Sequence, residues 1–292
     1  MNHHQASLPI VLTIAGFDPS CGAGIGADLK TLSANNCYGI AAVTALTVQS
    51  TQGVTGIHVT PVATLRAQLD ALADDLQIEA VKIGMLGNRA NAVAVAEFLD
   101  QRGFTRVVLD PVVQPSAGGP DLLDNSGLKY LSEELMKRAT VMTPNISEAA
   151  LLTGMEIKDL AGMEAAARKL VERGARAVVV KGGHMEKPID VFFDGAEVLT
   201  LGGDHVKTEH THGSGCTFAS AIAAQLALGR GLREAVMLAK AYVTKAIENG
   251  FAIGKGSGPL DHFYRTHHEP PARGVHEVPQ HGMHPAAEPT TR

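Results

Sequence analysis

The sequence predicts an α/β fold in which helices cover both faces of a central, mostly parallel sheet, a three-layer αβα arrangement. Short β-branched apolar runs alternate with longer amphipathic stretches, as is typical of strands joined by crossover helices. The apolar runs are also nearly continuous, as expected for strands buried on both faces. Since ligands of such sheets bind beyond the carboxyl ends of the strands, the residues that follow each strand are the candidates for a functional site.

The strands and helices are expected in alternation along the chain. The expected strands are Pro9–Ala15, Ile40–Val48, Ala80–Ile83, Arg106–Leu109, Thr140–Thr143, Ala177–Val180 and Val191–Phe193. The expected helices are 24–36, 61–76, 89–101, 127–138, 146–153, 162–174, 215–228 and 232–249. Pro61 suits a first helical turn with Thr60 as its N-cap, and Gly174 and Gly229 stand where helices should end.

The chain is expected to form one domain over residues 1–265, followed by a disordered tail over 266–292. The tail is rich in Pro and His and has no apolar period. With 292 residues, 45% of them hydrophobic, the chain can bury a full core. No transmembrane helix or signal peptide is expected, because the apolar runs, Leu8–Ala15 among them, are too short.

The charge and the cysteine content exclude some partners. The net charge is −5 and the aromatic content only 4%, so a nucleic-acid partner is not expected. Three cysteines are too few for a disulfide framework, which favours a reducing, cytoplasmic location.

The first candidate motif is the glycine-rich stretch 15–28, directly after the first strand. Gly22, Gly24 and Ala27 match a dinucleotide-binding fingerprint, but the loop before them is too long and no acid follows the next strand. The motif therefore favours a loop whose small residues let another ligand approach the backbone.

Several polar side chains follow the later strands. Gln49 could read the edge of a heteroaromatic ring, because an amide both donates and accepts, or it could cap a loop. Met85, after Gly84, could pack against such a ring or belong to the core. Asp110 stands at a strand end, where it would face the ligand crevice and organise metal or phosphate.

A further group of residues suggests a binding site for phosphate and magnesium. Asn145 and Glu148 offer oxygen ligands from one helical turn, although the same pair could form a capping box. Lys181 leaves a buried strand into a glycine loop and could contact a phosphate.

The clearest motif is Thr211–Ser220, which opens a helix of small residues. Gly213, Ser214 and Gly215 should leave amide groups pointing outward as an anion hole, with Cys216 in the first turn, where a thiol pKa falls. His205, His210, His212 and Cys216 resemble a zinc site by proximity, but the glycines make a tetrahedral arrangement awkward.

Together these motifs resemble the hydroxymethylpyrimidine/phosphomethylpyrimidine kinases of thiamine biosynthesis, within the ribokinase-like superfamily. The resemblance spans about residues 9–264 and includes T-I-A-G-F-D-P-S-C-G-A-G-I-G-A-D-L-K, T-A-L-T-V-Q, K-I-G-M-L, D-P-V, T-P-N-I-S-E-A, V-K-G-G-H, T-H-G-S-G-C-T and G-K-G-S-G-P-L. Cys216 replaces an aspartate that is usual in sugar kinases, which favours the pyrimidine and pyridoxal branch.

The resemblance implies ATP-dependent phosphorylation, with Mg²⁺, of 4-amino-5-hydroxymethyl-2-methylpyrimidine and then of its monophosphate. It implies a pyrimidine pocket formed by Gly16, Ala23, Asp28, Gln49 and Met85. It implies Cys216 as general base beside Gly213 and Gly215, ATP contacts from Lys181, Ser214 and Asn145, and metal ligation by Glu148 and Asp110. It also implies a homodimer.

Alternatives to a pyrimidine kinase are a pyridoxal kinase of the same branch, a non-catalytic pyrimidine sensor and a nicotinamide oxidoreductase. The chain departs from the family pattern at Cys21, where glycine is usual, at Phe17 and over Gln114–Gly119. A positive φ at Cys21 would strain its backbone.

Overall fold

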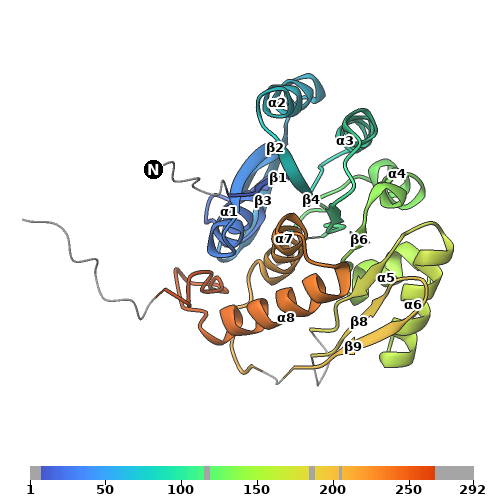
Figure 1. Cartoon of the computed structure of the whole chain (residues 1–292). Helices are drawn as coiled ribbons and strands as arrows, with labels where there is room; N and C mark the ends of the chain where they lie inside the picture. The colour runs from blue at the N-terminus through green and yellow to red at the C-terminus, as the bar shows by residue number, and fades with distance from the viewer. Residues whose placement is uncertain (1–7, 115–118, 184–187, 204–205, 267–292) are drawn as a thin grey trace, which may run out of the picture.

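The computed structural model describes residues 8–114, 119–183, 188–203 and 206–266. Over these residues the chain forms one sheet in the order β3-β2-β1-β4-β5-β6-β7-β8-β9 (Figure 1). The strands are β1 (Ile10–Phe17), β2 (Tyr38–Ser50), β3 (Gly53–Val59), β4 (Ile78–Ile83), β5 (Val107–Leu109), β6 (Val141–Met142), β7 (Val178–Val180), β8 (Asp190–Phe193) and β9 (Val198–Leu201). The sheet is parallel from β2 to β7, and β3, β8 and β9 pair antiparallel.

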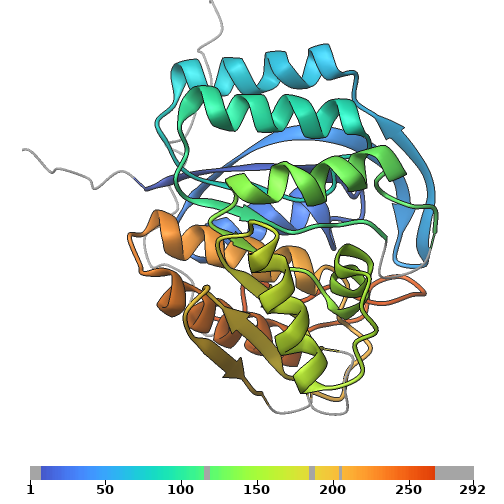
Figure 2. The ribbon, with the colours of Figure 1, turned by 90° about the vertical axis from the view of Figure 1, so that its right-hand side faces the viewer.

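The helices form a layer on each face of this sheet (Figures 1 and 2). They are α1 (Gly24–Ala34), α2 (Val62–Asp75), α3 (Arg89–Arg102), α4 (Asn125–Glu133), the 3-10 helix η1 (Leu135–Arg138), α5 (Ile146–Thr153), α6 (Leu160–Glu172), α7 (Ser214–Ala227) and α8 (Leu232–Glu248). On β1, Val11 packs with α1, α7 and α8, whereas Leu12 and Ile14 pack with α2 to α6. The expected three-layer αβα fold is therefore confirmed.

The expected strands and helices are all present, and the differences lie mainly at the edges. β3 and β9, the two edge strands of the sheet, were not among the expected strands. The single helix expected over 127–138 is α4 followed by η1. Thr60 does not cap α2, because its amide still bonds to the Thr44 carbonyl and Pro61 takes the N-cap position.

The expected tail lies, apart from Thr266, outside the described residues. Among the helices that the structure describes, none combines the length and the apolar character that crossing a bilayer requires. Cys21 has a φ of 55°, so the strain anticipated for a cysteine at this position is present in the loop between β1 and α1.

Candidate active site

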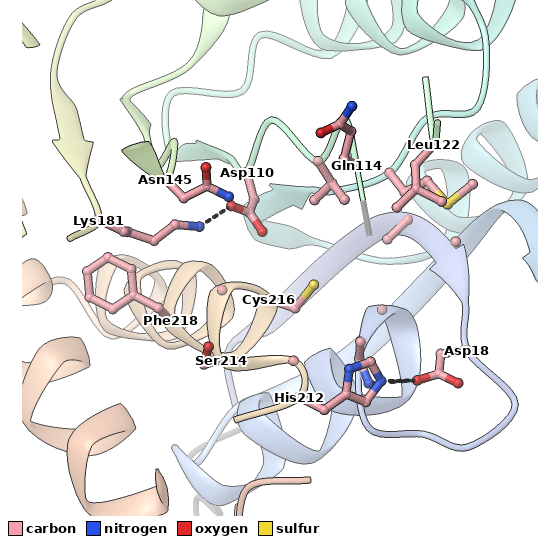
Figure 3. A pocket seen from close by; sticks show the side chains of 18 of the residues that line it. Asp18, Asp110, Gln114, Leu122, Asn145, Lys181, His212, Ser214, Cys216 and Phe218 are labelled. Carbon is pink, nitrogen blue, oxygen red and sulfur yellow. Dashed lines mark hydrogen bonds and ion pairs between the residues drawn. The ribbon is translucent and has the colours of Figure 1, made fainter. Parts of the chain in front are cut away.

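A cavity of about 240 Å³ lies where the loops after the central strands meet the start of α7 (Figure 3). It brings together residues that are up to two hundred positions apart in the sequence. The predicted site residues that line it are Gly16, Ala23, Gln49, Met85, Asp110, Asn145, Glu148, Lys181, Gly213, Ser214, Gly215 and Cys216.

Asp28 is the predicted pocket residue that does not line the cavity. Its side chain is completely buried and pairs with the Lys82 ammonium at 2.9 Å. It also accepts hydrogen bonds from Thr13 at 2.6 Å and Ser220 at 2.7 Å. Asp28 therefore does not line the pocket as expected, because this carboxylate joins α1 to β1, β4 and α7 within the protein.

One part of the cavity is largely apolar and includes a close contact between Met85 and the β1 backbone. A Cβ atom on Gly16 would lie 2.7 Å from Met85 Sδ, so glycine allows the thioether to pack directly on the β1 backbone. Val54, Val112 and Leu122 add apolar surface to the same wall. The polar amide of Gln49 stands among these groups, as required of a residue that reads a ring edge.

The start of α7, where the sequence predicts an anion-binding turn, packs tightly against the loop after β1. Gly213 precedes the helix with a φ of 81°, and a Cβ there would lie 1.9 Å from the Gly22 carbonyl oxygen. Only glycine fits this position, which brings the loop after β1 against the first turn of α7. The helix N-terminus, Gly213 to Cys216, then lines the cavity, where its dipole favours a negatively charged group, although the Ser214 amide is already bonded to the Thr211 carbonyl.

The Cys216 thiol lies in this first turn but is not acidified in the free protein. Burial raises its pKa to about 11, and the charges of Asp28 and Asp110 act in the same direction. The Lys82 ammonium and the Gly24 amide oppose this rise without overcoming it. A lowered thiol pKa is therefore not what the free protein shows, because burial and the charges of Asp28 and Asp110 outweigh the Lys82 charge and the Gly24 amide.

Lys181 and Asp110 form an ion pair beside the anion-binding turn. Lys181 Nζ lies 2.8 Å from Asp110 Oδ1, which also accepts the Thr143 hydroxyl at 3.0 Å (Figure 3). A Cβ on Gly215 would lie 3.0 Å from Lys181 Nζ. Burial alone would lower the pKa of Lys181, but the nearby charges of Asp110 and Glu148 outweigh it and raise the pKa. A protonated amine is thus held where a phosphate at α7 would meet it.

Asn145 and Glu148 form the capping box that was one of the two interpretations of their spacing. The Asn145 amide donates to Glu148 Oε2 at 2.8 Å, and the Glu148 amide donates to Asn145 Oδ1 at 2.9 Å. Both residues nevertheless line the cavity, so forming the capping box does not prevent them from contacting a ligand. Burial raises the pKa of Glu148 to about 7, against the lowering effect of Lys181, and Asp110 adds to the rise.

This donor set fits Mg²⁺ bound together with phosphates. Two buried carboxylates repel each other across the cavity, and a divalent cation near them would relieve that repulsion. Within the described ranges no three His, Cys, Asp or Glu side chains cluster to hold a metal on their own. Oxygen ligands from phosphates would complete such a site, as Mg²⁺ commonly requires. His205 of the zinc-like set, and residues 115–118, fall outside the described ranges.

Several functional candidates escaped the sequence analysis. Asp18 and His212 line the cavity, with His212 Nε2 2.9 Å from Asp18 Oδ2. Lys240 and Asp190 line it too, and their ion pair measures 2.7 Å. His212 stands in the quoted T-H-G-S-G-C-T motif, but the sequence suggested it only as a metal ligand. No local sequence pattern connects His212 with Asp18 or Lys240 with Asp190.

The stretch after α8, residues 251–262 (the closing segment), ties two loops of the cavity together. The Gly256 amide donates to Thr51 Oγ1 at 3.1 Å, just beyond β2. The His212 amide donates to the Gly258 carbonyl at 3.3 Å, just before α7. A Cβ on Gly256 would lie 1.9 Å from the Thr51 carbonyl oxygen, so the two backbones touch.

Comparisons with known proteins agree with this geometry. Residues 18–261 match the sequence model of the family described as phosphomethylpyrimidine kinase. A relative named hydroxymethylpyrimidine/phosphomethylpyrimidine kinase, from Bacillus subtilis (strain 168), is 45% identical over 255 residues, which cover 86% of this chain and 94% of the relative.

Two solved structures resemble the whole fold. The pyridoxal kinase from Staphylococcus aureus in complex with AMP-PCP and pyridoxal has a TM-score of 0.82 and 34% identity, covering 90% of this chain and 97% of its own. The phosphomethylpyrimidine kinase from Clostridium difficile 630 has a TM-score of 0.73 and 35% identity, covering 82% of this chain and 99% of its own. At these levels of identity the similarity extends beyond the fold to the family.

Proposed function

The chain belongs to the phosphomethylpyrimidine kinase family, and we propose how the residues of its cavity divide that family's reaction among them. It is a phosphotransferase of thiamine biosynthesis with a ribokinase-like fold, and it uses ATP and Mg²⁺. Its substrates are 4-amino-5-hydroxymethyl-2-methylpyrimidine and then the monophosphate of that alcohol. The observation that carries the residue roles is that Gln49, Lys181 and Cys216 line one cavity.

The pyrimidine ring lies against Met85 and the Gly16 backbone, with Ala23 at its edge. Gln49 reads the ring, because its amide can donate to a ring nitrogen and accept from the exocyclic amine. This placement directs the adjacent hydroxymethyl group toward the first turn of α7, where Cys216 and the anion-binding amides lie.

Transfer of the phosphoryl group then depends mostly on positioning and charge. The hydroxymethyl oxygen forms a bond to the γ-phosphorus, the bond from that phosphorus to the bridging oxygen breaks, and ADP leaves. The amides of Gly213 and Gly215 bind the migrating group and Lys181 binds the phosphate oxygens, whereas the Ser214 amide already donates to the Thr211 carbonyl at 3.1 Å. The proton of the alcohol passes to Cys216 Sγ once the thiol has released its own proton to solvent in the complex.

The raised pKa of Cys216 means that the base must be generated in the complex. The charge of Asp110 is one cause of the raised pKa, and in the free protein Lys181 pairs with Asp110. We propose that Asp110 and Glu148, with Asn145, hold Mg²⁺, which supplies positive charge to the phosphates. With the charge of Asp110 offset in this way, the thiol loses one of the charges that keep it protonated.

Product analysis tests this assignment. The full chain with the pyrimidine alcohol and MgATP should yield first one and then two added phosphoryl groups by mass spectrometry. Cys216→Ala should reduce turnover by about a hundredfold or more, as expected for loss of a positioned base. Unchanged turnover in this variant would favour a pyrimidine sensor over an enzyme whose base is Cys216.

A pyridoxal kinase is the second candidate, because pyridoxal kinases of 34% identity align over nearly the whole chain. Pyridoxal is also a methylated heteroaromatic ring that carries a hydroxymethyl group. Steady-state ATP consumption with each alcohol separates the two, and faster turnover of pyridoxal would contradict the pyrimidine assignment.

We also propose that the kinase domain ends near residue 265 and that the chain is a cytoplasmic homodimer. Its three free cysteines support the cytoplasmic location. The exposed Leu46 and Val48 on β2, at 53% and 51%, support a contact between copies. Light scattering after size exclusion should give twice the chain mass, and Leu46→Ser with Val48→Ser should lower it; a monomeric parent protein would contradict the dimer.

A further inference from the structure

His212 is held firmly between two parts of the cavity that the reaction uses. Its side chain is 6% exposed, and its backbone amide donates to the Gly258 carbonyl. A Cβ on Gly22 would lie 2.3 Å from His212 Cδ2, so the loop after β1 packs directly on the ring. The imidazole therefore has little freedom to turn, and the positions of its nitrogens are set by the fold.

The Asp18 carboxylate determines what His212 presents to the cavity. Asp18 Oδ2 lies 2.9 Å from His212 Nε2 and also accepts the Ala23 amide at 3.0 Å. Burial would raise the pKa of Asp18, but the hydrogen bonds from His212, Ser20 and Ala23 outweigh it and hold the pKa below its usual value. An ionised carboxylate only accepts hydrogen bonds, so His212 Nε2 carries a hydrogen.

This hydrogen affects the orientation of the neighbouring Gln49 side-chain amide. Gln49 Nε2 lies 3.3 Å from His212 Nε2, which sets two N–H groups against each other. At its other end, Gln49 Oε1 lies 3.1 Å from Thr47 Oγ1, whose hydroxyl also lies 3.0 Å from the Phe17 carbonyl. That hydroxyl has one hydrogen and cannot satisfy both acceptors.

Turning the Gln49 amide by 180° removes both conflicts. Its oxygen then faces the single hydrogen of His212 Nε2, which Asp18 Oδ2 at 2.9 Å and Gln49 at 3.3 Å share as a three-centre hydrogen bond. Its NH₂ donates to Thr47 Oγ1, and the Thr47 hydroxyl donates to the Phe17 carbonyl. The two amide orientations have nearly the same shape, so the surrounding hydrogen bonds decide between them. His212 and Thr47 together favour the turned orientation.

We propose that His212 is a positioning residue that fixes the acceptor end of the Gln49 amide, and so selects a 4-aminopyrimidine over a 4-oxopyrimidine. The acceptor end, beside His212, receives the exocyclic amine, and the donor end meets the adjacent ring nitrogen. A 4-oxopyrimidine offers a carbonyl and a ring N–H, which require the reverse orientation. The hydroxymethyl group is the other neighbour of the exocyclic amine on the ring. The hydroxymethyl group therefore lies toward Gly213 and Cys216, two residues that follow His212 closely in the sequence.

The test compares kcat/KM for the 4-amino alcohol with that for its 4-oxo analogue, and it depends on the proposed function. In the parent protein we expect a preference of about a thousandfold or more for the 4-amino substrate. In His212→Ala the preference should fall about tenfold to a hundredfold, because the amide can turn to suit either ring. A merely structural role would lower both values equally and leave their ratio unchanged.

Two further variants keep the result decisive. Thr47→Val removes the hydrogen bond at the other end of the amide and should also lower the preference, so it decides the question if His212→Ala is inactive. His210→Ala changes a histidine of the same loop for which the structure shows no side-chain contact with Gln49, and it should keep the parent preference. The inference is overturned if His212→Ala keeps the parent preference. Where His212→Ala is inactive, an unchanged preference in Thr47→Val overturns it instead. A fall in His210→Ala equal to that in His212→Ala would also overturn it. A parent protein that phosphorylates neither ring would instead contradict the proposed function.

Discussion

The Lys82 ammonium lies 2.9 Å from Asp28 Oδ2, and neither side chain is exposed to solvent. The carboxylate is further satisfied by Thr13 and Ser220, whereas among the residues that the structure describes the ammonium donates to Asp28 alone. The pair stands directly below the residues that the reaction uses, and the Lys82 charge reaches Cys216.

Removing one member of this pair should destabilise the fold strongly. We expect Asp28→Asn or Lys82→Met to lower the free energy of unfolding in urea by about 3–5 kcal/mol, because each leaves a buried charge without its partner. The double variant should lose less than the sum. Arg230→Ala, which breaks an exposed ion pair with Glu234, is the control and should lose under about 1 kcal/mol. Equal losses in all variants would contradict a special role for the buried pair.

The Cys216 thiol should react slowly with iodoacetamide near neutral pH in the free protein. Since its pKa is about 11 and only the thiolate reacts, the rate should rise about tenfold per pH unit between pH 8 and 10. Peptide mass spectrometry distinguishes Cys216 from Cys21 and Cys37. A rate that levels off below pH 9 would show that the helix terminus does acidify the thiol.

Magnesium binding should weaken as the pH falls below about 7. The raised pKa of Glu148 means that its carboxyl is neutral below that pH and charged above it, and a neutral carboxyl is a poor cation ligand. Calorimetric titration of Mg²⁺ with ADP should therefore show lower affinity at pH 6 than at pH 8. In Glu148→Gln this difference should shrink, whereas in the exposed Glu156→Gln it should persist. A pH-independent affinity in the parent protein would remove Glu148 from the metal site.

Gly213 should tolerate no side chain, for reasons of space as well as of conformation. Gly213→Ala should lower kcat/KM by about a hundredfold, because its Cβ would push the first turn of α7 away from the Gly22 carbonyl. Gly229→Ala has a similar φ of 83° but open space around its Cβ, so it should lose about 1 kcal/mol of stability and keep its activity. Equal activity in the two variants would contradict the close approach at Gly213.

The sequence alone predicts the layers of the fold, and every predicted site residue except Asp28 lines the cavity. Buried parallel strands are recognisable from continuous apolar runs such as Val178–Val180, and the residues after them fall at one edge of the sheet by topology. The edge strand β3 is half exposed, and its composition resembles a loop. Charge partners such as Lys82 and Asp28 are 54 positions apart, and no local pattern pairs them.

Asp28 and Cys216 show why residue roles are harder to predict than residue positions. Asp28 stands one helical turn beyond the glycine loop, but its side chain points into the protein, where Thr13, Lys82 and Ser220 meet it. The Cys216 thiol does lie at a helix N-terminus, but burial and two carboxylates raise its pKa. Both outcomes depend on groups from several distant strands and helices.

The closing segment has a consequence for synthesis on the ribosome. Its bonds to Thr51 and His212 join loops that are otherwise formed by much earlier parts of the chain. A nascent polypeptide that has already released β1 to α7 still lacks the backbone that anchors His212. Catalytic competence therefore requires the closing segment to have left the ribosome and to have docked between these two loops.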